Sequence, residues 1–189
     1  MLVLLVGPKG SGKSHIGRVL ERELGAHFIH VEPLWMAYYA ECRRAGREPG
    51  IPAGITEVHP QIADALRARD LVCVETTGAS REILDGLLSL APPSERLAVR
   101  IWAPLEVCLE RIAARDPSVQ IPMDPEMIRK VHALGETADV PSAFTVTNTE
   151  LTDDEIADMF RRALAPRSNA ATSDFDRAPA STNEQGETT

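Results

Sequence analysis

The chain has 189 residues, of which 43% are hydrophobic and 25% are charged, and these proportions are those of a soluble globular protein. The formal net charge of −8 disfavours a general attraction to nucleic acid or to an anionic membrane surface, so neither is expected as a partner. No apolar run approaches the ~20 residues that a membrane-spanning helix needs, and the three cysteines lack metal-binding spacing, which predicts a cytoplasmic protein with free thiols.

The chain begins with a strand, predicted over residues 2–6, and a glycine-rich run, GPKGSGKS, follows at 7–14. This run has the spacing G-x-x-x-x-G-K-S, the signature of a phosphate-binding loop (P-loop). The residues that set the spacing are Gly7, Gly12, Lys13 and Ser14. Residues 13–24 then carry apolar side chains at helical spacing and end at Gly25. A strand before the loop and a helix after it are the context in which this signature binds phosphate.

Each part of the loop predicts a contact with a nucleoside triphosphate. Glycines let the backbone wrap closely round an anion with its N–H groups pointing inward, and the positive end of the following helix adds to the attraction. Lys13 is expected to reach the β- and γ-phosphates, and the Ser14 hydroxyl is expected to bind Mg²⁺. The residues expected to contact the nucleotide are Gly7, Gly10, Ser11, Gly12, Lys13, Ser14 and His15, the last through its backbone N–H. ATP and Mg²⁺ are therefore the predicted cofactors.

Two further strands are predicted at 27–31 and 71–75; Glu32 comes just after the first, and Glu75 is the last residue of the second. Ligands of parallel sheets gather at the C-terminal ends of the strands, so these positions are candidates for the site. Glu75 either holds Mg²⁺ through water, orients the attacking hydroxyl, or merely faces solvent. Glu32 either accepts a hydrogen bond from the substrate hydroxyl or only ends its strand, and Gly78 permits a substrate to approach the backbone closely.

The helix predicted at 104–115 carries Arg111 and Arg115, which are four residues apart and therefore lie on one face. A polar break, RDPSVQIP, follows this helix, and Asp124-Pro125 begins the next one. In small kinases such a segment closes over the transferring phosphates as a lid and supplies arginines to the developing charge. The alternative is a solvated helix face with surface salt bridges.

The remaining elements complete an alternation of strands and helices. The predicted strands are 2–6, 27–31, 71–75, 97–103 and 143–147, and the predicted helices are 13–24, 55–69, 104–115, one beginning at Asp124 and one after a capping box of Thr152 with Glu155. The alternation predicts βαβ units and an α/β three-layer sandwich. Composition turns polar near Ala165, which predicts one domain over 1–165 and a disordered tail over 166–189.

The runs GPKGSGKSHIGRVLERELGAHFIHVE and APLEVCLERIAARD resemble the shikimate-kinase-like small P-loop kinases and related small P-loop ATPases of the AAA type. The resemblance implies a P-loop NTPase fold with a five-stranded parallel sheet of order 2-3-1-4-5, MgATP as donor and a hydroxyl group as acceptor. It places Lys13 and Ser14 in the phosphate and magnesium roles, Glu32 and Gly78 at substrate positions, and Arg111 or Arg115 at the lid. Shikimate kinases carry aspartate at the position of Glu32, a glycine triplet in place of TTGAS, and an F-R-x-x-E segment that residues 40–60 lack.

These patterns predict an ATP-dependent phosphotransferase, a kinase that moves the γ-phosphate of MgATP to a hydroxyl of a small molecule. Lys13, Glu75, Arg111 and Arg115 are the expected catalytic residues, and Ser14 and Glu75 the expected metal ligands. Two alternatives stay open: a nucleotide or polynucleotide kinase, and a nucleotide-dependent regulatory ATPase or switch. The protein is expected to be a monomer or a weak dimer.

Overall fold

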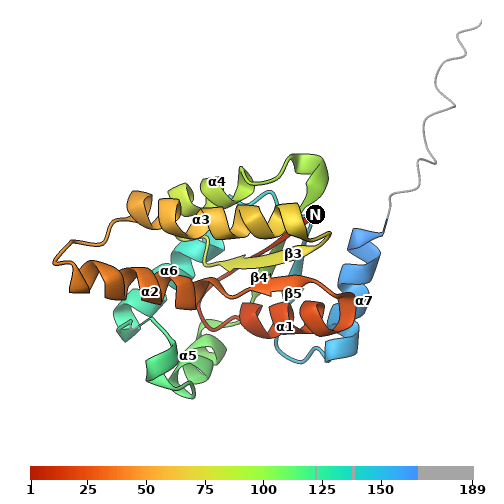
Figure 1. The fold of residues 1–189 in the computed structure, drawn as a ribbon. Coiled ribbons are helices and arrows are strands. Elements are labelled where there is room, and N and C mark those ends of the chain that lie inside the picture. The colour runs from red at the N-terminus through yellow and green to blue at the C-terminus, as the bar shows by residue number, and fades with distance from the viewer. Residues whose placement is uncertain (122, 138, 166–189) are drawn as a thin grey trace, which may run out of the picture.

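The structure is a computed structural model, and it describes residues 1–121, 123–137 and 139–165 (Figure 1). Its strands are β1 (Leu2–Val6), β2 (His27–Ile29), β3 (Val72–Thr76), β4 (Arg96–Trp102) and β5 (Phe144–Thr147). All neighbouring strands pair in parallel, in the order β2-β3-β1-β4-β5. The predicted sheet and its 2-3-1-4-5 order are therefore confirmed. The tail predicted at 166–189 lies outside the described residues.

Helices connect the strands and cover both faces of the sheet (Figure 1). The helices are α1 (Lys13–Leu24), α2 (Val31–Arg44), α3 (Ile51–Ala68), α4 (Arg81–Leu88), α5 (Leu105–Ala113), α6 (Pro125–Thr137) and α7 (Asp153–Leu164), with short 3₁₀ turns η1 (Pro93–Glu95) and η2 (Pro117–Val119). Helix α7 begins with the predicted capping box, in which the Glu155 N–H donates to Thr152 and the Glu155 carboxylate accepts from the Thr152 N–H. The three-layer sandwich is confirmed. None of the helices within the described ranges is both long and apolar enough to cross a membrane.

The central strand β1 contributes side chains to the hydrophobic cores on both faces of the sheet. All five of its residues are buried, and alternate side chains point to opposite faces. Leu2 and Leu4 pack with residues of α2, α3 and α4 on one face. Val3 and Leu5 pack with residues of α1 and α7 on the other. The phosphate loop follows this buried strand directly, so the strand fixes the position of the start of the loop.

The prediction that strand 27–31 runs up to Glu32 is wrong. Strand β2 ends at Ile29, and α2 begins at Val31, so Glu32 lies in the first turn of a helix. The reason is packing: Val31, Trp35 and two later residues at helical spacing are buried in the core on the α2 side of the sheet. This burial outweighs the strand preference of FIHV.

Two helices differ from the prediction. Helix α3 begins at Ile51, four residues before the predicted 55–69, with a proline in its first turn. Helix α4 was not predicted; it has only eight residues, and Ser80 caps it by accepting a hydrogen bond from the Ile83 N–H (3.3 Å). Burial of its leucines against α3 compensates for its short length.

Candidate functional site

The phosphate loop joins β1 to α1, and its conformation depends on glycine. Gly10 and Gly12 have φ of +86° and +93°, values that other residues rarely adopt. A Cβ on Gly12 would also collide with the side chain of Asn148. Three hydrogen bonds hold the loop: Gly7 N–H to Thr76 O (3.1 Å), Ser11 N–H to Pro8 O (3.2 Å) and Asn148 Nδ2 to Ser11 O (3.0 Å). The loop thus has a fixed, glycine-dependent conformation, and its contacts with a nucleotide stay predictions.

Lys13 is the first residue of α1 and directly follows Gly12 of the phosphate loop. Its side chain is buried, and its ammonium donates to the carbonyls of Gly7 and Pro8, both at 2.9 Å. Burial lowers the pKa of Lys13, and the nearby Glu75 carboxylate opposes that shift. An ammonium has three protons, so one remains for a phosphate oxygen beside these two bonds.

Ser14 and Glu75 bring two oxygen ligands together beside Lys13. The Ser14 hydroxyl donates to Glu75 Oε2 (2.9 Å), and Glu75 is buried at the end of β3. Hydroxyl and carboxylate oxygens suit Mg²⁺, which takes few protein ligands and completes its shell with water and phosphate oxygens. Within the described ranges, no cluster of three or more His, Cys, Asp or Glu side chains is placed to hold a metal ion.

His30 was missed as a partner of this pair. Its Nε2 lies 3.1 Å from Glu75 Oε1, so His30, Glu75 and Ser14 form a continuous chain of polar contacts. The link arises because β2 and β3 are adjacent and parallel, which brings the residues that follow them to the same edge. Only the strand order could have revealed it from the sequence.

Glu32 is occupied by partners that the sequence did not indicate. Lys9 donates from its ammonium to Glu32 Oε1 (2.8 Å) and to Ile121 O (2.7 Å), and the Ile121 N–H donates to the same Oε1 (2.7 Å). Burial acts to raise the pKa of Glu32, but the hydrogen bonds from Lys9 and Ile121 outweigh it and hold that pKa below its usual value. This cluster links the phosphate loop and α2 to Ile121, which is the last residue of the segment 116–121, here called the connecting segment.

Arg111 lies in the last turn of α5, whereas Arg115 lies just beyond it, because α5 ends at Ala113 and not at residue 115 as predicted. The Arg111 guanidinium donates to Asn148 O (3.0 Å) and to Gly10 O (3.5 Å). Together with the loop and the chain after β5, the arginines enclose a cavity of about 390 Å³, here called the donor cavity. Its lining residues are Gly12, His15, Arg111, Ala114, Arg115, Asn148, Thr149 and Leu151. The His15 ring, which no role had been predicted for, lies 3.0 Å from Asp153.

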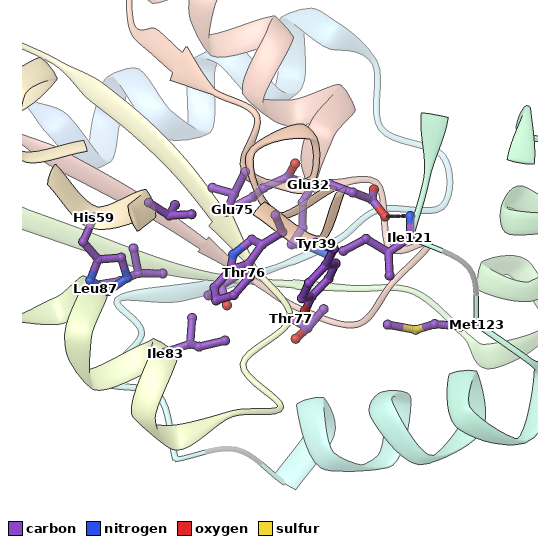
Figure 2. Close-up of a pocket in the computed structure, with 14 residues that line it drawn as sticks. Glu32, Tyr39, His59, Glu75, Thr76, Thr77, Ile83, Leu87, Ile121 and Met123 are labelled. Atoms are coloured by element: carbon purple, nitrogen blue, oxygen red, sulfur yellow. Dashed lines mark hydrogen bonds between the residues drawn. The ribbon is translucent and has the colours of Figure 1, made fainter. Parts of the chain in front are cut away.

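A second cavity of about 220 Å³, here called the acceptor cavity, is lined by Lys13 and by residues of α2, α3, β3 and α4, among others (Figure 2). Its lining residues are Lys13, Val31, Glu32, Trp35, Tyr39, Val58, His59, Glu75, Thr76, Thr77, Ile83, Leu87, Ile121 and Met123. Figure 2 shows Glu32 and Glu75 along one wall, His59 beside Leu87 at one end, and Met123 at the opposite end. Gly78 follows these threonines with φ of +74°, and its N–H lies 3.4 Å from Thr76 Oγ1, but it is not among the lining residues.

The comparisons with known proteins agree with this architecture. A family model described as an AAA domain matches residues 2–133. Among solved structures, a sugar kinase from Janibacter sp. HTCC2649 is 16% identical with a TM-score of 0.63, over 87% of this chain and 95% of that chain. A gluconokinase from Sinorhizobium meliloti 1021 is 22% identical with a TM-score of 0.54, over 86% and 89%. A shikimate kinase from Aquifex aeolicus is 23% identical with a TM-score of 0.51, over 87% and 96%.

No curated protein matches the chain significantly. The likeness to solved structures, at these identities, shows the fold, and it confirms the prediction of a small P-loop kinase fold. The region matched by the family model, residues 2–133, includes the phosphate loop, β3, α5 and most of α6.

Proposed function

The chain belongs to the AAA domain family, and from this premise we propose that it is an ATP-dependent phosphotransferase. It transfers the γ-phosphate of MgATP to a hydroxyl group of a small molecule. The observation that carries the proposal is the presence of two cavities at the phosphate loop and the start of α1, the donor cavity lined by Gly12 and the acceptor cavity lined by Lys13. A regulatory ATPase needs a nucleotide site and water, whereas this chain has a second cavity, lined by Lys13 and Glu75, that can take an acceptor.

On the donor side, the chain's own groups position and neutralise the triphosphate. The backbone amides of the loop hold the phosphates. The third N–H of the Lys13 ammonium, which is not used by the carbonyls of Gly7 and Pro8, donates to an oxygen of the transferring γ-phosphate. Arg111 and Arg115 place two guanidinium groups where charge develops during transfer. Ser14 and Glu75 would hold Mg²⁺, which neutralises phosphate charge when bound.

On the acceptor side, two carboxylates face the attacking hydroxyl. Glu75 lines the acceptor cavity next to Lys13, so its carboxylate can accept a hydrogen bond from that hydroxyl and orient it. Glu32 Oε1 is taken by Lys9 and Ile121, which leaves Oε2 as the oxygen that faces the acceptor. Gly78, two residues after Thr76 of this lining, has a positive φ and no side chain, which leaves its backbone open to a substrate.

The test is ADP release from MgATP with and without a panel of small hydroxyl compounds. Acceptor-dependent release with formation of a phosphate monoester supports the proposal. If no acceptor changes the rate of ADP release, the regulatory ATPase is supported instead. If only nucleotides or nucleic-acid 5′ ends stimulate ADP release, a nucleotide or polynucleotide kinase is supported.

Lys13→Ala identifies the site in the same assay, with Lys130→Ala on the exposed face of α6 as the matched control. Loss of a preorganised donor to the transferring phosphate should lower turnover by about 10²–10³-fold. Wild-type turnover in Lys13→Ala would reject the assignment of the loop.

A further inference from the structure

The acceptor cavity has a charge pattern that restricts what it can bind. Among its described lining residues, Lys13 is the only lysine or arginine. Its ammonium donates to two loop carbonyls, those of Gly7 and Pro8, at 2.9 Å each. Glu32 and Glu75 add two carboxylates to the same wall (Figure 2).

Neighbouring cations are engaged elsewhere and cannot serve an anionic acceptor. Lys9 is bonded to Glu32 and to Ile121 O. Arg111 and Arg115 line the donor cavity. The described lining therefore offers an acceptor carboxylate or phosphate no uncommitted lysine or arginine, and burying such a charge without a counter-ion is strongly unfavourable.

The walls of the cavity are largely apolar and include aromatic rings. Trp35 and Tyr39 project from α2, with ring centroids 5.9 Å apart and planes tilted by 42°. Ile83, Leu87 and Met123 face them from other elements. Such walls favour a flat, apolar body, because aromatic faces and aliphatic side chains gain by excluding water from it.

His59 supplies the one recognition group at the far end of the cavity. The residue is only 9% exposed, and within the described part of the chain its ring has no hydrogen-bond partner. Gly86 makes room for the ring, since a Cβ there would lie 2.6 Å from His59 Cε1. Burial lowers the pKa of His59, so the ring is neutral at neutral pH and offers one donor and one acceptor.

We propose that the acceptor is an uncharged molecule with an apolar, ring-sized body, the phosphorylated hydroxyl at the Glu75 end and a second polar group that bonds His59. The inference rests on the proposed function, because it assigns the substrate class of the acceptor cavity. It predicts that this kinase rejects carboxylated and phosphorylated acceptors, since the cavity holds carboxylates where a site for such acceptors needs cations.

The test measures binding without turnover. The chain has two tryptophans, so Trp102→Phe leaves Trp35 in the cavity as the sole indole reporter. Matched pairs of probes differ only in charge: shikimate with methyl shikimate, and para-hydroxymethylbenzoate with its methyl ester, each titrated with a non-hydrolysable ATP analogue and Mg²⁺ present. In these pairs the ester should change Trp35 fluorescence at a concentration at least about tenfold lower than the acid. Equal or tighter binding of the acids, or no pair in which the ester is favoured, overturns the proposal.

Variants of His59 test the second contact. His59→Ala should weaken binding of methyl para-hydroxymethylbenzoate by about threefold to tenfold, whereas His59→Gln should retain most of it. Benzyl alcohol lacks the second polar group, so its binding should not change in either variant. His27→Ala, on the exposed start of β2, is the matched control. Equal weakening of both probes would reduce His59 to a packing role and reject this contact.

ADP release, measured separately with the same probes, distinguishes failure of this inference from failure of the proposed function. If esters bind but none stimulates ADP release with phosphate transfer, the proposed transfer fails while the charge preference stands. If the acids stimulate release and the esters do not, the kinase stands and the uncharged acceptor is rejected.

Discussion

Replacing Lys9 with methionine removes a single buried ammonium from the junction of three elements. Its two hydrogen bonds connect the phosphate loop to Glu32 of α2 and to Ile121 of the connecting segment. The side chain of Lys9 is 7% exposed and that of Glu32 is 18% exposed. Methionine fills a similar volume, so Lys9→Met removes the charge with little loss of packing.

The expected cost follows from what the substitution leaves behind. Glu32 keeps one backbone N–H but loses its counter-ion, and Ile121 O loses its donor. Removal of one partner from a buried ion pair costs about 3–5 kcal/mol, and partial exposure of Glu32 reduces this to about 2–3 kcal/mol. For a domain of this size the corresponding fall in Tm is roughly 4–12 °C.

Urea unfolding of Lys9→Met, Glu32→Gln and the double variant measures both the loss and its origin. The double variant should be less destabilised than the sum of the single ones, with a coupling of about 1–3 kcal/mol, and the Ile121 amide should exchange its hydrogen roughly tenfold faster in Lys9→Met. Lys130→Met on the exposed face of α6 serves as control. A free energy of unfolding within about 0.5 kcal/mol of wild type, or strict additivity, would refute the reasoning.

Three further predictions follow from the site and its charges. Glu75→Gln should raise the Mg²⁺ concentration needed for half-maximal turnover by roughly tenfold, whereas Glu82→Gln on the exposed start of α4 should not; an unchanged Mg²⁺ titration would make Glu75 a structural carboxylate. Arg111→Ala and Arg115→Ala should each lower kcat by about tenfold or more with smaller changes in Tm, and full turnover in both would leave the arginines with only a packing role. The pKa of Glu32 is lowered in the folded state from its ordinary 4.5, so its contribution to stability is complete above about pH 4.5 and is lost as the pH falls through the lowered value. Urea midpoints measured from neutral to acidic pH should fall more steeply for wild type than for Glu32→Gln, and parallel curves would contradict this.

The parts of the site that could be predicted are those encoded locally. The phosphate loop has a signature of eight consecutive residues, and its conformation needs glycine at fixed places whatever surrounds it. Alternating strands and helices allow few topologies, so the parallel sheet follows from the same pattern. Arg111 and Arg115 both line the donor cavity, although α5 ends at Ala113 and Arg115 lies beyond it; their roles stay predictions.

The parts that could not be predicted depend on residues distant in the chain. Lys9 and Ile121 are 112 residues apart, and Ile121 and Glu32 are 89 apart, so no local pattern indicates their cluster. His30 reaches Glu75 only because β2 and β3 are neighbours in the sheet. The boundary between β2 and α2 was wrong for a related reason: residues after the strand, including Trp35, decide it by packing in the core.

The two outer strands of the sheet are also its shortest, with three residues in β2 and four in β5. A free strand edge exposes unpaired amides and carbonyls on which another chain can assemble, and short edges offer few of them. Both rims of this sheet therefore provide a poor template for intermolecular β-pairing. Aggregation by edge-to-edge stacking is accordingly disfavoured by the architecture itself, without charged or proline gatekeepers within either strand.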